Sequence, residues 1–497
     1  MHRTIRHILI CSICCSVLSI GCTNKNCNEL VELRDKHAVE DLECIYSRVD
    51  LPNRPLTLED IIDIAWTHNY EALAKELEWE VEKELTTSEM LQMLPNLTIN
   101  AERSKRNNST AATAFVPSTH MLAPAEIGSA ERVNIWDITF NFRILDFAIA
   151  YYRSSAEAWR ALGVYMQYTR LKQNLVLSIY KSYWRAISAR AVIGKSLEML
   201  DLISEFRKKF DKNIDLRLLS VVPALKIEDQ LLGFQVQFYD LDLQYLSAKT
   251  ELAEFMGLPA DIEFELAPVE MIPPPCLEPV EFLEETALRY RPELYGGDFE
   301  EAMAADEVRQ AIIPLLPNAE IFKSYHFNAD KFLVHHYWIV TGWRIAYELL
   351  GIPSKVFNIS SAKFNEDRAY YARLAVAVAV LTQVRVSYTN YQIAYDQYDI
   401  RSDVANVRKR LADATNDEFV QGEFNEVDVV LARANALQGE IDAIRAYGEL
   451  QVQLEQLNNS IGQPLRYTTF AQPINVPYEE DMWESSLECT DGEFKEL

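Results

Sequence analysis

The chain contains the stretch Ala65-Trp66-Thr67-His68-Asn69-Tyr70-Glu71, which recurs 222 residues later as Ala287-Leu288-Arg289-Tyr290-Arg291-Pro292-Glu293. A second pair, Met93-Leu94-Pro95-Asn96 and Leu315-Leu316-Pro317-Asn318, keeps the same displacement. Anchors that recur at one displacement and in one order indicate an internal duplication. We therefore predict two copies of one structural unit.

The duplication continues toward the C-terminus at a displacement of 205 residues. Three apolar or aromatic positions and one glycine match at this spacing: Leu175, Ile179, Tyr183 and Gly257 correspond to Val380, Val384, Tyr388 and Gly462. The displacement decreases from 222 to 205 between residues 96 and 175. The first copy therefore contains extra residues in that interval.

Each copy predicts the same order of elements. Thr57-Leu58-Glu59-Asp60 is close to a capping box, and the helical pattern that follows runs to about Gln92, before Pro95. Alternating strand patterns flank a polar loop of roughly 28 residues in the first copy and a shorter loop in the second. The alternating apolar positions are Leu97, Ile99, Ala101, Ile138, Phe140 and Phe142, then Ile321, Tyr325, Phe327, Tyr337, Ile339, Trp343 and Ile345.

A long helix and a returning helix follow each strand pair. The predicted ranges are 148–212 with 217–256, and 361–417 with 426–461. At 1.5 Å per residue, the first long helix is roughly 95 Å long, far beyond a typical globular helix. Spacings of three and four predict a coiled-coil seam in the second at Leu374, Val378, Leu381, Val384, Tyr388, Tyr391, Tyr395 and Tyr398.

The predicted fold class is mainly α with a small β part. Four strands cannot close a membrane barrel, since about eight is the practical minimum, and open strand edges are not tolerated in lipid. Several chains must therefore pool their strands. The scarcity of glycine, at 15 residues, suits long uninterrupted helices.

The first residues have the layout of an export signal. Arg3 and Arg6 precede an apolar run that ends at Gly21-Cys22. This ending resembles a bacterial lipoprotein signal, which would make Cys22 the site of lipid attachment; Ser19 departs from that pattern, and a plain signal peptide is the alternative. Cys27, Cys44, Cys276 and Cys489 remain beyond it, and a Cys27–Cys44 disulfide stays open. No later stretch reaches about 18 apolar residues.

We divide the chain into five segments. They are a signal peptide (1–21), a linker (22–54), a first repeat (55–275), a second repeat (276–465) and an acidic tail (466–497).

The composition and motifs exclude several functions. A net charge of −26 argues against nucleic-acid binding, although it fits both a solvated helical surface and a cation-preferring pore. The sequence has no GxGxxG, P-loop, HExxH or GxSxG motif. His335-His336 is the only histidine pair, and on the predicted strand its rings point to opposite faces. We therefore predict no catalytic residue, no metal site, no cofactor and no enzyme.

Residues 55 to 465 resemble the TolC family of outer-membrane efflux proteins. The resemblance rests on Leu56-Thr57-Leu58-Glu59-Asp60, on both Leu-Pro-Asn anchors, and on Phe419-Val420-Gln421-Gly422-Glu423-Phe424 leading into Val427-Asp428-Val429-Val430. It implies a homotrimer with a shared twelve-stranded β-barrel in the bacterial outer membrane. It also implies a helical tunnel that reaches a periplasmic adaptor and an inner-membrane pump. The signal resembles that of the lipid-anchored drug-efflux branch.

Two residues are candidates for the periplasmic gate and tip. Gly422 would supply the positive φ of a tight turn between two helices. The resemblance places Asp428 where acids from three chains ring the closed gate; a solvated helix acid is the alternative. Leu431 and Phe424 depart from the family pattern of charged gate residues. The first-copy tip, near Asn213 and Ile214, lacks the glycine.

The leading functional hypothesis is passive conduction of substrates delivered by the partner pump. The alternatives are a periplasmic coiled-coil lipoprotein scaffold that conducts nothing, and the outer-membrane duct of a type I protein secretion or metal efflux system.

Overall fold

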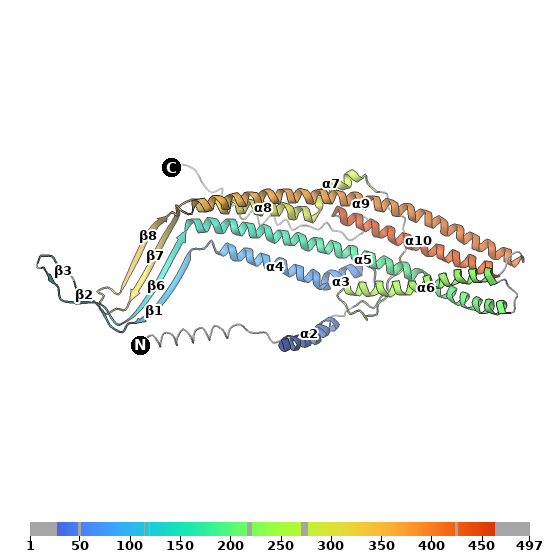
Figure 1. The fold of residues 1–497 in the computed structure, drawn as a ribbon, viewed down its shortest axis with the longest axis horizontal. Coiled ribbons are helices and arrows are strands. Elements are labelled where there is room, and N and C mark those ends of the chain that lie inside the picture. Colours follow the sequence, from blue (N-terminus) through green and yellow to red (C-terminus); the bar gives the residue numbers. More distant parts are fainter. Residues whose placement is uncertain are drawn as a thin grey trace.

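The computed structural model describes residues 27–47, 51–113, 115–118, 120–215, 221–269, 277–422 and 426–462. The protein is elongated, with the sheet β1-β6-β7-β8 at one end and the ends of α5, α6, α9 and α10 at the other (Figure 1). The helices are α2 (Cys27–Ser47), α3 (Leu58–His68), α4 (Tyr70–Leu91), α5 (Ile144–Asp215), α6 (Val221–Phe255), α7 (Val280–Tyr290), α8 (Pro292–Ile312), α9 (Ile352–Val420) and α10 (Glu426–Ile461). The strands are β1 (Asn96–Lys105), β2 (Thr110–Ala112), β3 (Phe115–Val116), β4 (Met121–Leu122), β5 (Glu126–Ser129), β6 (Arg132–Arg143), β7 (Asn318–Asn328) and β8 (Tyr337–Ala346).

The four long helices confirm the predicted pairs of long and returning helices. The first long helix runs a few residues further at each end than expected, so Asn213 and Ile214 lie in the last turn of α5. The linker predicted at 22–54 contains a 21-residue helix, α2. Short strands, β2 to β5, lie within the loop of the first copy.

The helix predicted from about Thr57 to Gln92 is wrong in one respect, because it is two helices. Thr57 caps α3 with a complete capping box: its hydroxyl accepts from the Asp60 N–H, and the Asp60 carboxylate accepts from the Thr57 N–H. The first helix ends at Asn69, which has an extended backbone (ψ 116°) and accepts from the Ala72 N–H. A residue whose side chain caps the next helix favours such a break.

The second copy breaks at the equivalent position. Arg291, 222 residues after Asn69, is also extended (ψ 123°) and separates α7 from α8. Pro292 then takes the first position of α8, where its missing N–H costs no hydrogen bond. The duplication seen in sequence is therefore present in the backbone geometry.

A glycine turn packs against each helix break. Gly257 follows α6 with φ +67°, and Gly462 follows α10 with φ +80°. A Cβ on Gly257 would lie 2.4 Å from the His68 carbonyl oxygen, and one on Gly462 would lie 2.9 Å from that of Tyr290. Only glycine combines this φ with so close an approach. We call these two contacts the helix junctions.

Side chains at the helix breaks bind the last carbonyls of the returning helices. In the first junction the Asn69 amide donates to the Phe255 carbonyl (3.1 Å). In the second, the Arg291 guanidinium donates to the Asn459 and Ser460 carbonyls (3.0 and 3.1 Å). Phe255 and Ser460 are equivalent at the displacement of 205. Both contacts satisfy carbonyls that a helix end leaves without an intrahelical partner.

Two arginines share one carboxylate in the second junction. Arg291 is 3% exposed, and its side chain donates to both oxygens of Glu293 at 3.0 Å. The Arg170 Nε lies 2.6 Å from the same carboxylate. Burial lowers the pKa of Arg291 and lowers that of Arg170 to about 10, against the raising effect of Glu293. The cluster thus couples α5, α8 and α10.

A carboxyl near this junction makes stability depend on pH. Burial raises the pKa of Glu455 to about 7, against a hydrogen bond from the Asn458 amide (3.0 Å) that lowers it. Because the folded pKa lies above the unfolded value, the free energy of unfolding falls as pH rises between about 4.5 and 7. We expect Glu455→Gln to raise that free energy by about 1–3 kcal/mol at pH 8 and by little at pH 4.5. Thermal unfolding of the purified protein at both pH values measures this; an equal gain at both would contradict it.

The helices pack side by side into a wall, and the set of helices in this wall changes at the helix junctions. On the strand side of the junctions, α4 packs against α5, α5 against α8 and α8 against α9. On the other side, the contacts run from α6 to α5, from α5 to α10 and from α10 to α9. The helices α5 and α9 therefore run the length of the wall (Figure 1).

The coiled-coil seam predicted on α9 is only partly correct. Val384 and Tyr391 are buried, whereas Val378 and Tyr395 are 64% and 44% exposed. The buried face instead runs through Val380, Val384, Ser387, Tyr391 and Ala394. Residues at spacings of three and four in this region lie on two faces of the helix. Among the described helices, α9 alone contains an apolar window long enough to cross a membrane, although no stretch beyond the signal was expected to reach that length.

The four long strands form one antiparallel sheet in the order β1-β6-β7-β8. Strands of the two copies meet in the middle, where Ile138 of β6 is opposite Tyr325 of β7. The connection between β7 and β8 is fixed by Asp330, which is 3% exposed and accepts from the Ala130 and Phe332 N–H groups. His335 and His336 lie in this connection and not on a strand.

Candidate functional site

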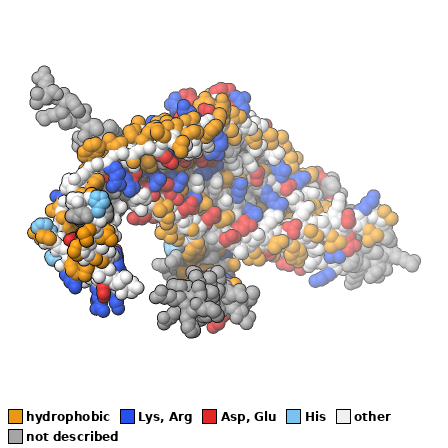
Figure 2. All heavy atoms as spheres, turned by 60° about the vertical axis from the view of Figure 1, so that its left-hand side comes forward, with side chains coloured by type: hydrophobic (Ala, Val, Ile, Leu, Met, Phe, Trp, Pro, Cys, Tyr) orange, Lys and Arg blue, Asp and Glu red, His pale blue; other side chains and the backbone are white. Residues whose placement is uncertain are grey.

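One face of the sheet is mostly apolar on all four strands, with Lys323 and Thr341 as polar exceptions in one row. The pairing register places Ile99, Ile138, Tyr325 and Ile339 in one row across all four strands. Every alternating apolar position predicted from sequence falls on this same face, and Ile99 and Ile339 are 65% and 61% exposed. Hydrophobic side chains gather at the strand end of the molecule (Figure 2). Such a continuous exposed face is what contact with lipid requires.

Aromatic residues concentrate toward both ends of this face. Trp136, Phe327 and Tyr337 form one row. Phe142 and Trp343 belong to a row six residues away, which corresponds to about 20 Å of strand. Membrane barrels carry aromatic girdles at both ends of their apolar band, and the two aromatic rows of this face follow that arrangement.

The opposite face of the sheet is polar. The His326 Nδ1 lies 2.6 Å from the Asp137 carboxylate, and the His326 ring stacks on Trp338 at 5.4 Å. Nearer the helices, Arg344 lies over the Phe322 ring and 3.6 Å from Glu320. A sheet with one lipid-compatible face and one charged face has the sidedness of a pore wall.

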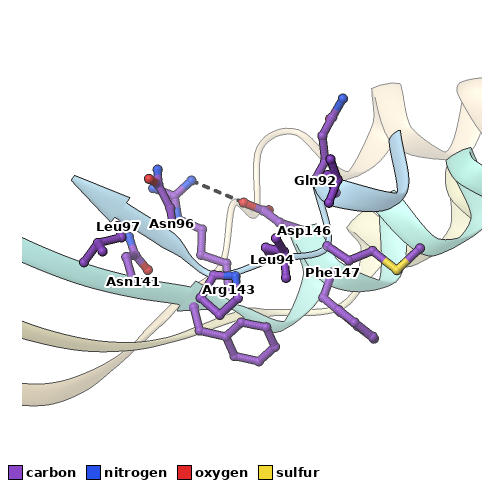
Figure 3. A pocket seen from close by; sticks show the side chains of 12 residues that line it. Gln92, Leu94, Asn96, Leu97, Asn141, Arg143, Asp146 and Phe147 are labelled. Atoms are coloured by element: carbon purple, nitrogen blue, oxygen red, sulfur yellow. Dashed lines mark hydrogen bonds and ion pairs between the residues drawn. The ribbon is translucent and has the colours of Figure 1, made fainter. Parts of the chain in front are cut away.

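A pocket of about 380 Å³ lies where the sheet joins the helices, lined by side chains from β1, β6, α4 and α5 (Figure 3). Arg143 at the end of β6 and Asp146 in the first turn of α5 form an ion pair at 3.4 Å. Leu94, Leu97 and Phe147 supply the apolar side. The ion pair spans the strand-to-helix corner, where the apolar face of the sheet ends.

The sheet and the helix wall both end in unpartnered edges. In the described sheet, β1 and β8 each pair on one side only. Beyond β1, α4 exposes Leu77, Val81 and Leu85, which are 47–66% accessible. Beyond β8, α9 exposes a strict seven-residue repeat of apolar side chains: Phe357, Phe364, Tyr371 and Val378, all at least 64% accessible. Exposed apolar stripes along both edges indicate protein contacts.

At the far end of the molecule, Gly422 follows α9 with φ +87°. The positive φ expected of Gly422 is therefore confirmed. Among the described residues, a Cβ at this position would meet no atom within 4 Å, so there the requirement for glycine comes from the backbone. Asp428 lies in the first turn of α10 and is partly buried. The negative charge is favourable there because it faces the positive end of the helix dipole.

Leu431 and Phe424 are the two residues that depart from the family pattern of charged gate residues. Leu431 packs against a core cluster that includes Ile203, Leu231 and Val430, so its apolar character is explained by packing between α10, α5 and α6. Phe424 lies outside the described residues.

The predicted lipid attachment residue, Cys22, also lies outside the described residues, as do Cys276 and Cys489. Cys44 is exposed and free. Cys27 and Cys44 are both in α2, and 17 residues of helix separate their Cα atoms by about 25 Å. A disulfide needs less than about 7 Å, so the Cys27–Cys44 bond considered above is excluded within one helix.

Sequence reasoning missed the pairing of polar residues on the inner face. Asp137 and His326 each alternate with the apolar positions of their own strands, but they are 189 residues apart in the chain. The only signal available was the strand alternation that puts both on one side; their opposition depends on the register between β6 and β7.

Comparison with known proteins identifies the fold. No protein-family model matches the sequence, and no curated protein matches it. Among solved structures, the outer-membrane channel OprN has a TM-score of 0.66 and 14% identity, covering 82% of this chain and 90% of that one. The open state of the MtrE outer membrane channel of Neisseria gonorrhoeae has a TM-score of 0.65 and 15% identity (82% and 89% coverage). The CmeC outer membrane channel of Campylobacter jejuni has a TM-score of 0.64 and 13% identity (82% and 85% coverage). The chain therefore has the fold of the TolC-like outer-membrane channels, which its sequence resembles.

Proposed function

We propose that this protein is the outer-membrane channel of a tripartite efflux system. Three copies pool their strands into a twelve-stranded barrel in the bacterial outer membrane, and their helix walls form a tunnel into the periplasm. The channel is passive and not an enzyme: a periplasmic adaptor and an inner-membrane pump supply its substrates and the energy.

The observation that carries this proposal is the alignment of unpartnered edges. β1 and α4 lie along one side of the wall, and β8 and α9 lie along the other (Figure 1). Joining the β1 side of one copy to the β8 side of the next is a head-to-tail contact, which closes into a ring when the rotation permits. Closure removes the open strand edges that a bilayer does not tolerate.

The two faces of the sheet support conduction over the scaffold alternative. A scaffold built from coiled coils does not need a sheet with an exposed face that is mostly apolar on all four strands. In a closed ring the apolar face contacts lipid, and the face that carries Asp137, His326 and Arg344 lines the aqueous lumen.

Conductance tests the proposal. The full-length protein is expressed in a Gram-negative host, extracted from the outer membrane in detergent and added to a planar bilayer. We expect a trimer by native mass and stepwise currents in salt. A monomer that gives no current would overturn the proposal and favour the scaffold.

The partner pump selects the substrate class, so the substrate class is tested in cells that contain the pump. A deletion strain is compared with its complemented parent for survival with antibiotics and with metal ions, and for its secreted proteins. We expect antibiotic sensitivity. Loss of metal resistance or of a secreted protein alone would favour the metal-efflux or type I secretion duct.

For the gate, we expect Asp428→Ala to raise the resting conductance and to weaken cation selectivity, because three carboxylates near one axis repel each other and attract cations. Current–voltage curves under a salt gradient measure both. Asp35→Ala in α2 is the control, since it removes one exposed acid per chain far from the α9–α10 turn. A curve unchanged from wild type would place Asp428 on the solvated outside.

For the lipid anchor, we expect Cys22→Ser to abolish acylation of the protein. Metabolic labelling with a palmitate analogue, followed by mass spectrometry of the mature N-terminus, measures this. Cys44→Ser is the matched control and should keep full labelling, because Cys44 is exposed but lies within a helix. Labelling that survives Cys22→Ser would show that another residue is modified.

A further inference from the structure

A pocket of about 570 Å³ lies on the strand side of the helix junctions, between α5, α8 and α9. Its volume is within the range of about 300–1,000 Å³ that small-molecule sites occupy. In this part of the wall α5 and α8 are the two inner helices, since α4 and α9 form the edges. Contacts between copies along those edges therefore leave the pocket open to a ligand.

The pocket opens on the face of the wall that continues the polar face of the sheet. Arg143 alternates with the apolar positions of β6, as Asp137 does, and it pairs with Asp146 at the start of α5. From Asp146, exposed polar side chains continue along α5 at a strict seven-residue spacing: Arg153, Arg160, Gln167, Asn174 and Lys181. In coiled-coil packing this spacing keeps side chains on one side of a helix. Three members of the stripe line the pocket, so it faces the tunnel of the proposed channel.

Two glycines inside helices keep the pocket open. Gly163 of α5 and Gly296 of α8 both line it, and a Cβ on either would meet no described atom within 4 Å. Glycine in the interior of a helix is destabilising relative to alanine, and at these two positions no described neighbour is close enough to require it. The space that both glycines leave belongs to the pocket.

The apolar lining of the pocket contains two stacked rings. The ring centroids of Trp159 and Phe299 are 5.7 Å apart, and the ring planes are inclined by 23°. Each ring lies about one turn from the glycine of its own helix. Met166 and Met303 add polarisable thioethers, which make favourable contacts with aromatic rings. This lining fits a flat aromatic molecule.

One carboxylate of the pocket is left without a cation. The three arginines that line the pocket are each paired with an acid: Arg160 with Glu157 (2.8 Å), Arg170 with Glu293 (2.6 Å) and Arg373 with Glu301 (2.8 Å). Glu300 also lines the pocket, one turn after Gly296; it is exposed and makes no hydrogen bond or ion pair with a described residue. A cation at this place is attracted both by the carboxylate and by the faces of the aromatic rings.

We propose that this pocket binds a planar aromatic cation, with the ring against Trp159 and Phe299 and the positive charge beside Glu300. The wall of the tunnel then holds such a cation as it passes. The position of the pocket on the tunnel face rests on the proposed function, whereas binding itself requires only the folded wall.

Ethidium, a planar aromatic cation, is the probe that tests the pocket. The full-length protein is extracted in detergent from nuclease-treated outer membranes, and ethidium binding is followed by fluorescence anisotropy. We expect saturable binding with one site per chain. Glu300→Gln should weaken the binding about three- to tenfold, because it removes the charge and keeps the shape of the side chain. Asp35→Asn in α2 removes an exposed acid far from the pocket and should leave the affinity unchanged.

Gly296→Leu fills the pocket from within. Its side chain enters the space that the glycine leaves, so we expect the affinity for ethidium to fall by at least about tenfold while the native mass stays that of wild type. Gly194→Leu in α5 is the matched control. Gly194 is also a glycine inside a helix with no described atom within 4 Å of an added Cβ, but it does not line the pocket. It should bind ethidium as wild type does.

The outcomes separate the site from the proposed function. Wild-type affinity in Gly296→Leu would overturn the site, as would equal displacement of ethidium by naphthalenesulfonate, an aromatic anion. The wild-type protein is also tested for conductance in planar bilayers. A conducting trimer that binds no ethidium would overturn the site and leave the channel intact. Saturable binding that both Gly296→Leu and Glu300→Gln weaken, in a protein that gives no current, would support the site and overturn the channel.

Discussion

Gly257→Ala is expected to lower the free energy of unfolding by about 2–4 kcal/mol. Two costs add at this position. The backbone has φ +67°, where a Cβ is strained, and the new Cβ would lie 2.4 Å from the His68 carbonyl oxygen. The oxygen belongs to the backbone at the end of α3, so relief requires movement of the junction between α3 and α6. Denaturant unfolding of the detergent-solubilised protein measures the loss.

Gly422→Ala is the matched control that separates the backbone cost from the steric cost at Gly257. It has a similar φ of +87°, but no described residue lies within 4 Å of the added Cβ, so the expected loss is the backbone cost of about 1 kcal/mol. Gly462→Ala, whose Cβ would meet the Tyr290 oxygen at 2.9 Å, should fall between the two. Equal losses at Gly257 and Gly422 would show that close packing at the junction contributes nothing.

Arg291→Met is expected to lower the free energy of unfolding by about 3–5 kcal/mol, which is the usual effect of removing one partner from a buried charged network. Methionine preserves most of the volume but removes every donor. The Ser460 carbonyl at the end of α10 and the amide oxygen of Gln383 then lose their hydrogen bonds, and the Asn459 carbonyl keeps only the one from Arg170. Glu293 keeps only Arg170. The same denaturant experiment measures this effect, and the yield of assembled trimer should fall with it.

Arg289→Met provides the comparison, two residues earlier in the chain. The Arg289 side chain is 67% exposed and pairs with the equally exposed Glu285, so its loss should change stability by less than about 0.5 kcal/mol. If both substitutions cost the same, the buried network would be no stronger than a surface ion pair. A large loss confined to Arg291 would support the view that the second junction is held by charge.

Several elements were predictable because their signals are local. Pro95 and Pro317 end their helices in any context, and the alternation around Ile138 or Ile339 assigns each side chain to a face of its strand. The absence of proline from 148 to 212 similarly predicted most of α5. Elsewhere a local signal was ambiguous. Asn69 is compatible with a helix interior, and its role as a cap became clear only from its bonds to Ala72 and Phe255.

The α9 helix shows why spacing alone fails on a long amphipathic helix. Its apolar residues at intervals of three and four satisfy two different stripes. One is buried against α10 through Leu450, and the other is exposed through residues such as Ile400. Sequence cannot assign a residue to one or the other, because each stripe meets the same helical period. Packing against a specific neighbouring helix decides which stripe is buried.

The sequence by itself determined that the protein is duplicated, that each copy holds two strands and a long helical hairpin, and that four strands need partners from other chains. These conclusions follow from periodicity, proline positions and barrel closure, which require no knowledge of distant contacts. The tertiary structure alone decided the strand order, the opposition of Asp137 and His326, and the helix junctions built on Gly257 and Gly462. The central β6–β7 pairing, the contact of Asp137 with His326 and both junctions join residues more than 160 positions apart, and such contacts depend on the packing of the whole wall.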